Sequence, residues 1–190
     1  MRIFRHLARD RKGMVALEMA FVGAPFLLLL VTILDLGLML ATQSVLEGSA
    51  RDAARLIRTG QVQSQTSPIT TFQTLLCSDM SSIMSTATCQ ASVIFEVQTF
   101  SNFGSISLTP CTQNANQSGS GTPCSFTPGS ASQIVAVQAT YNRPFIVPWV
   151  SACLTGGTCW IGPSMANGSN PGSGTAPLIS TVIFKNEPFS

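Results

Sequence analysis

Charged residues and histidine are scarce in this chain of 190 residues, and their scarcity excludes several classes of protein. Only 9% of the residues are charged, against about a quarter in an ordinary soluble domain, so a freely soluble enzyme is not expected. The single histidine, His6, lies in the first dozen residues, which removes histidine-based catalytic pairs and histidine-bound metals from the rest of the chain. We therefore expect a binding or structural protein that is not an enzyme and uses no cofactor or metal.

The few charges are unevenly distributed along the chain. The first twelve residues carry five bases and one acid, whereas the remainder carries five bases and seven acids. A remainder with net negative charge cannot form the basic face that nucleic-acid binding requires. We therefore expect no nucleic-acid partner.

A long apolar run follows the basic tip. Residues 14–34 read MVALEMAFVGAPFLLLLVTIL, in which Glu18 is the only charged residue. About 20 apolar residues suffice to cross a bilayer as a helix. The basic tip should stay in the cytoplasm by the positive-inside rule, which places the rest of the chain on the other side of the membrane. The sequence thus predicts a single-pass membrane protein.

The helical pattern continues beyond the apolar run. Apolar side chains recur near helical spacing as far as Arg58, and Gly60 is suited to end the helix. Pro25 lies inside this predicted helix and should bend it or locally interrupt its hydrogen bonds. Asp35 follows the apolar run, and we interpret it as a structural residue at the outer membrane interface.

Small residues form a stripe on the first part of the predicted helix. Ala16, Ala20 and Ala24 follow one another at steps of four residues, so they lie on one face. Such a stripe lets another helix approach closely in a membrane. Alanine is also common in helices of this kind, and the sequence leaves both explanations open.

The sharpest local motif is KGMVALE, at residues 12–18. A short basic leader ends in Gly13, and Glu18 follows five residues later inside an otherwise apolar helix. The motif resembles the type IV prepilin pattern, in which a membrane aspartyl peptidase cuts after the glycine. This resemblance implies processing between Gly13 and Met14.

A wider set of features resembles the TadE-like family of Flp (Tad) pilus proteins. Residues 184–189, FKNEPF, are similar to the usual ending of the family. The other shared features are a glycine, an acid in the helix start, a proline before a leucine run, an acid followed by glycine, and an alanine-rich segment: Gly13, Glu18, Pro25, Asp35-Leu36-Gly37 and Ala53-Ala54-Arg55.

The resemblance implies a minor pilin or pseudopilin of the inner membrane, with its C-terminal domain periplasmic or incorporated in a pilus. The implied partners are the membrane, the major Flp pilin, other minor pilins, the prepilin peptidase and the Tad inner-membrane platform. Glu18, Pro25 and the alanine stripe are then the candidate assembly residues. Two alternatives stay open: an adhesive binding module at the tip, and an unprocessed bitopic envelope scaffold. Met19 favours the scaffold, because an aromatic residue usually follows the glutamate in Flp-type prepilins.

The part beyond the long helix predicts a small α+β domain. We divide the chain into a leader at 1–13, a transmembrane and extended helix at 14–60, and a disulfide-containing domain at 61–190. Periodicity in the domain predicts an antiparallel sheet packed on helices, with polar loops between the strands. The expected elements are a helix over 68–84, strands over 91–100, 134–141 and 178–184, and loops over 112–132 and 162–177.

Six cysteines lie in this domain. An even number of cysteines in an oxidising compartment indicates disulfides, and the absence of a Cys-x-x-Cys pair argues against a redox or zinc motif. Six cysteines allow fifteen pairings, and the sequence alone does not choose among them. We favour the sequential set, in which each bridge closes a local loop: Cys77–Cys89, Cys111–Cys124 and Cys153–Cys159.

Overall fold

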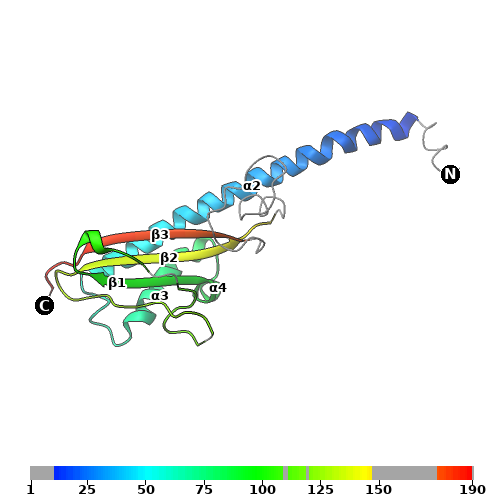
Figure 1. Ribbon diagram of the computed structural model, residues 1–190. Helices are drawn as coiled ribbons and strands as arrows, with labels where there is room; N and C mark the ends of the chain where they lie inside the picture. The colour runs from blue at the N-terminus through cyan, green and yellow to red at the C-terminus, as the bar shows by residue number, and fades with distance from the viewer. Residues whose placement is uncertain (1–10, 109–110, 119, 147–174, 190) are drawn as a thin grey trace.

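The structure is a computed structural model that describes residues 11–108, 111–118, 120–146 and 175–189, with the backbone alone for residues 11–17. It has the predicted α+β architecture, in which a long N-terminal helix carries a small domain (Figure 1). The elements are α2 (Arg11–Arg58), α3 (Pro68–Asp79), η1 (Met80–Ser82), α4 (Thr86–Ser92), β1 (Val93–Phe100), η2 (Phe103–Ser105), β2 (Ile134–Pro144) and β3 (Thr175–Lys185).

Helix α2 is a single element of 48 residues, about 72 Å long at 1.5 Å per residue, and it contains Pro25. Its first half extends away from the domain and its second half lies along it (Figure 1). The helix ends as predicted before Gly60, whose φ of +79° favours glycine over any other residue. A Cβ atom at this position would also lie 2.5 Å from the ring of Phe189, so glycine allows the C-terminal tail to pack there.

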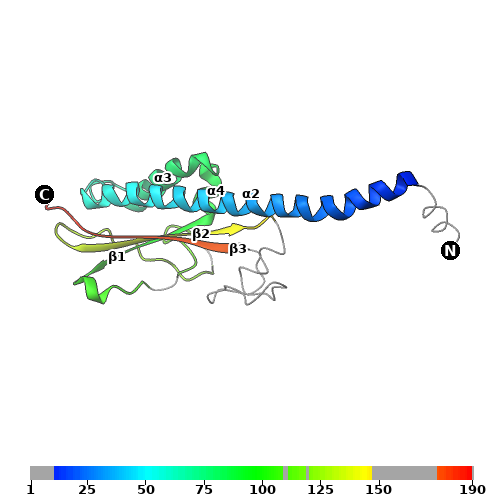
Figure 2. The same ribbon diagram turned by 90° about the horizontal axis from the view of Figure 1, so that it is seen from above.

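The sheet contains three antiparallel strands in the order β1-β2-β3. Its register aligns Val97, Val137 and Val182 across the three strands, and these side chains belong to the core or pack against it. Helices α2 and α3 cover this face of the sheet (Figure 2). All three predicted strands are present, and β2 and β3 extend beyond their predicted bounds.

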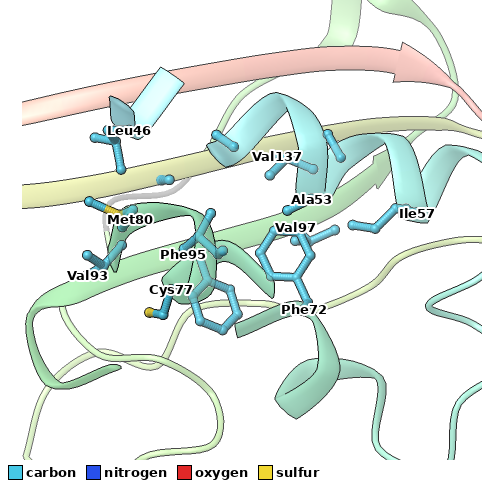
Figure 3. Packing of buried hydrophobic residues seen from close by; sticks show 14 of the residues in the cluster. Leu46, Ala53, Ile57, Phe72, Cys77, Met80, Val93, Phe95, Val97 and Val137 are labelled. Carbon is cyan, nitrogen blue, oxygen red and sulfur yellow. The ribbon is translucent and has the colours of Figure 1, made fainter. Parts of the chain in front are cut away.

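The core lies between the second half of α2, helix α3 and the inner face of the sheet. Figure 3 shows Ala53 and Ile57 of α2 beside Val137 and Val97 of the sheet, with Phe72 of α3 beside Phe95 of β1. The rings of Phe72 and Phe95 lie 5.1 Å apart between centroids. Because α2 supplies one wall of this core, the domain cannot bury its apolar face without the helix.

Two predicted boundaries are wrong, the end of the helix expected over 68–84 and the start of the strand expected over 91–100. The helix expected over 68–84 ends at Asp79 and passes into η1, and a further helix, α4, occupies residues 86–92, part of which was predicted as strand. Ser85 is the N-cap of α4, and its hydroxyl oxygen accepts a hydrogen bond from the Thr88 amide at 3.2 Å. The disulfide between Cys77 and Cys89 then holds this short helix against α3.

Described residues between Cys111 and Thr127 close the outer edge of β1. The Asn114 side chain accepts a hydrogen bond from the Phe95 amide at 2.7 Å and donates one to the Val93 carbonyl at 2.8 Å. These bonds pair backbone groups of β1 that a neighbouring strand would otherwise pair. Further along, Val97 donates to the Ser125 carbonyl and accepts from the Thr127 amide. The Cys111–Cys124 disulfide crosslinks the segment at its base. These contacts remove an exposed strand edge that would favour aggregation.

Candidate functional site

The first half of α2 presents an apolar surface to its surroundings. Within the described residues, α2 is long and apolar enough to cross a membrane, and little of its apolar window is buried inside the protein. Large exposed apolar side chains run from Met19 to Leu40, a distance of about 33 Å along a helix. This length matches the hydrocarbon core of a bilayer, which is about 30 Å thick.

The predicted assembly residues lie on this surface. Glu18, Ala20, Ala24 and Pro25 are exposed, and no described residue pairs with Glu18. The backbone of Gly13, Met14 and Ala16 is helical, but their side chains lie outside the described residues. The structure therefore leaves Glu18, Ala20 and Ala24 accessible to groups from outside the chain.

A buried ion pair connects α2 to the sheet where the helix leaves the domain. Arg143, near the end of β2, donates from Nη1 to the Asp35 Oδ1 atom at 3.0 Å. The second carboxylate oxygen, Oδ2, accepts from the Ile146 amide at 3.2 Å. Asp35 is 1% exposed, so its charge is screened from solvent by these partners. We name the segment Arg143–Ile146, together with its anchor Asp35, the junction corner.

The sequence predicted Asp35 as a structural residue but did not identify its partner. Asp35 and Arg143 are 108 residues apart, so no local pattern connects them. One signal was available, because Arg143 is the single base in the sequence between Arg58 and Lys185. A lone base near the end of an apolar strand indicates a specific acidic partner, since an unpaired buried charge is costly.

The C-terminal residues, which resemble the usual family ending, hold the opposite end of the domain. Glu187 accepts from Arg58 at 3.2 Å through its side chain, and its amide donates to the Arg58 carbonyl at 2.9 Å. The Asn186 side chain donates to the carbonyls of Pro128 and Ser130. The C-terminal residues therefore attach α2 to the sheet at one end of the interface between them, and the junction corner attaches α2 at the other end.

The disulfides support the same domain. The first two bridges of the sequential set, Cys77–Cys89 and Cys111–Cys124, are present in the structure. Cys153 and Cys159 lie outside the described residues, so their pairing stays a prediction. Both bridges lie within the domain and act on its conformation.

A second buried carboxylate lies on the face of the sheet that α2 and α3 leave uncovered. Glu96 of β1 is almost fully buried, and its Oε1 atom accepts from the Gln98 side chain. Its Oε2 atom has no hydrogen-bond partner among the described residues. Burial raises the pKa of Glu96 above its ordinary value, and the hydrogen bond from Gln98 opposes this rise only in part.

This raised pKa predicts a pH dependence of stability. Because the folded chain holds the Glu96 proton more tightly than the unfolded chain, the free energy of unfolding should rise as the pH falls from neutrality toward the ordinary value of 4.5. Glu96→Gln should remove this contribution, so its stability should depend less on pH than that of the wild type. Thermal unfolding of both proteins across this pH range tests the effect, and parallel pH curves would contradict it.

Comparison with known proteins agrees with the N-terminal features. Residues 13–55 match the family model described as TadE-like protein. Neither the curated proteins nor the solved structures include a match to this chain. The matched range contains Gly13, Glu18, Pro25 and Asp35, on which the resemblance depends, and it ends before α3. The N-terminal helix of this chain is therefore TadE-like, as the sequence predicted.

Proposed function

We propose that this chain is a minor pilin or pseudopilin of a Flp/Tad-type pilus. It is anchored in the inner membrane by α2, with its N-terminus cytoplasmic and its domain periplasmic. The observation that carries the proposal is the division of a TadE-like helix into two halves. One half is apolar and exposed over the length of a bilayer, and the other is built into the core of the domain.

This division suits a subunit that assembles through its helix. The exposed half can pack against the major Flp pilin and other minor pilins, since the alanine stripe permits close approach. The domain is attached to α2 at both ends of their contact, so it follows the helix as a rigid unit. Its surface then provides the contacts for initiation, for the tip or for adhesion. The role is structural and involves no chemical reaction by this chain.

The alternative is a bitopic envelope scaffold that keeps its N-terminal leader. Met19 favours it, because an aromatic residue is usual at this place in Flp-type prepilins. The two functions differ in the expected N-terminus, which is Met14 for the pilin and Met1 for the scaffold. They also differ in whether the chain is required for pili.

The test combines processing with pilus assembly. In the organism that encodes the chain, deletion of its gene should abolish or strongly reduce pili, and the wild-type gene should restore them. Gly13→Leu should keep the leader, since a bulky residue blocks the cleavage site, and should fail to restore pili. N-terminal mass analysis of membrane extracts and electron microscopy of the cells measure the two effects.

Gly23→Leu is the matched control for this experiment. Gly23 lies on the same helix with no atom within 4 Å of an added Cβ, so the chain itself tolerates a side chain there. This variant should be cleaved normally. A wild-type protein that retains Met1, in cells whose pili do not depend on the gene, would contradict the proposed function and favour the scaffold.

A further inference from the structure

The junction corner fixes a short apolar segment of the domain at a defined height along α2. The Ile146 amide and the Arg143 guanidinium both bond to Asp35, so the segment between them cannot move along the helix without breaking these contacts. Figure 2 shows the end of β2 reaching α2 where the helix leaves the domain. The Ile146 side chain is 66% exposed, so it is free to contact the surroundings of the domain at this height.

The exposed apolar surface of α2 extends on both sides of this height. Leu34 lies just before Asp35 and is exposed, and Leu38 and Leu40 lie beyond it and are also exposed. Leu40 lies about 8 Å farther along the helix than Asp35. An apolar surface that continues past the corner implies that the membrane continues past it too.

Two placements of α2 in the bilayer give the same result. If the span starts at Met14, its first 21 residues cover about 31 Å, and Asp35 lies at the edge of the hydrocarbon core. If the span instead covers the exposed apolar residues from Met19 to Leu40, Asp35 lies inside this core. In both placements the corner lies within the membrane or its interfacial layer.

The charges at the corner are compatible with this environment. Arg143 neutralises Asp35 within a direct ion pair, so the corner carries no net charge. The next charged residue along α2 is Glu47, about 18 Å beyond Asp35. The part of the domain that faces the lipid is therefore neutral and largely apolar. This lowers the free-energy cost of transferring it from water to the membrane.

We propose that residues Pro144, Phe145 and Ile146 form a second membrane contact, which inserts into the interfacial layer of the bilayer that α2 spans. The partner is the lipid itself, because the corner offers apolar side chains and no free charge for a specific headgroup. The contact orients the domain on the membrane surface. The proposal rests on the membrane span in the proposed function, and it does not depend on pilus assembly.

Depth measurements by electron paramagnetic resonance test the contact. The full chain is reconstituted in vesicles of phosphatidylethanolamine and phosphatidylglycerol, with a nitroxide attached through p-acetylphenylalanine at position 146, so that the cysteines keep their disulfides. Oxygen concentrates in lipid and a neutral nickel chelate in water, so their ratio of accessibilities reports depth. We expect the ratio at 146 to shift in the direction found for lipid.

Two further positions make the result decisive. Position 22 lies in the exposed apolar half of α2, and position 103 carries an equally apolar, exposed Phe103 at the far end of the sheet. We expect the accessibility ratio at position 146 to shift toward lipid, as at position 22, and to differ from the ratio at position 103. If the label at position 22 lies in lipid and the label at position 146 lies in water, the second contact is wrong but the membrane span of α2 is supported. If 22 reports water, the span and the proposed anchoring fail first.

A neighbouring copy of the chain would give a different pattern. Contact between copies would make the label at 146 inaccessible to both reagents, and dilution of the protein in lipid would relieve it. That outcome would overturn the lipid contact in favour of packing between subunits. Retention of both described disulfides in each labelled protein, checked by peptide mapping, confirms that the label has not unfolded the domain.

Discussion

Replacing Arg143 with alanine should lower the free energy of unfolding by about 3–5 kcal/mol, because the buried Asp35 carboxylate then loses its charged partner. The Ile146 amide alone would remain to compensate the charge. For a chain of this size, such a loss lowers the melting temperature on the order of 10 °C. Thermal unfolding of the full chain in detergent, followed by circular dichroism, measures the change.

The size of this effect follows from burial and not from the existence of an ion pair. Arg51 and Glu47 also form an ion pair, at 3.3 Å, but both side chains are substantially exposed. Exposed pairs contribute about 0–1 kcal/mol, so Arg51→Ala should have little effect. Arg51→Ala is therefore the matched control, since it also removes an arginine side chain but leaves no buried charge without a partner.

A double variant separates the ion pair from the packing around it. Asp35→Leu combined with Arg143→Met replaces both charges by apolar groups of similar size, and such replacements are often neutral for stability. We expect it to recover most of the stability that Arg143→Ala loses. If Arg143→Ala and Arg51→Ala were equally mild, the junction corner would contribute nothing to the attachment of the domain.

Local patterns in the sequence predicted the elements that local forces stabilise. The apolar run and the helical spacing up to Arg58 predicted α2. Alternation of apolar and polar residues predicted β1, and segments rich in β-branched residues predicted β2 and β3. Helix α4 was missed because TATCQAS has weak helix propensity, and the Ser85 cap and the Cys77–Cys89 bridge stabilise it instead. One of these contributions is a crosslink to another element, which no propensity scale contains.

The candidate functional residues also fall into two groups, those that local patterns identify and those whose roles depend on distant parts of the chain. Gly13 and Glu18 belong to one short motif, and Pro25 lies a few residues further along the same predicted helix, so local patterns in the sequence identified all three. Arg143 and Asn114 act on distant parts of the chain, on Asp35 and on the edge of β1, and they acquire their roles only when the sheet has formed. Residues of this kind are recognisable in a sequence only as isolated polar groups that need partners.

Glu18→Ala should abolish pilus formation while leaving membrane insertion, cleavage and disulfides intact. Cleavage after Gly13 would create a positively charged amine at Met14, four residues before Glu18 and at the start of a helix. An amine at this place adds to the positive end of the helix dipole and is poorly solvated among packed helices. A carboxylate one turn away neutralises it.

The structure leaves the Glu18 carboxylate available for this role. Glu18 is exposed on α2, and no described residue of the chain pairs with it. Its partner can therefore be the amine of a neighbouring subunit, which would fix the axial register because one offset alone brings the opposite charges together. Buried pairs are often weak for stability but can specify register, so the loss should appear in assembly.

Three variants distinguish this role from that of an ordinary acid near the membrane surface. Glu18→Asp keeps the charge with a shorter reach and should retain part of the pili, whereas Glu18→Gln keeps the shape and should lose them. Glu47→Ala removes a partly exposed acid of the same helix beyond the apolar half, and this variant should assemble normally. The measurements are pili counted by electron microscopy and the mature N-terminus by mass analysis. Normal pilus numbers with Glu18→Ala would show that the carboxylate is an interfacial acid without a part in register, because neither subunit contact nor amine neutralisation would then depend on it.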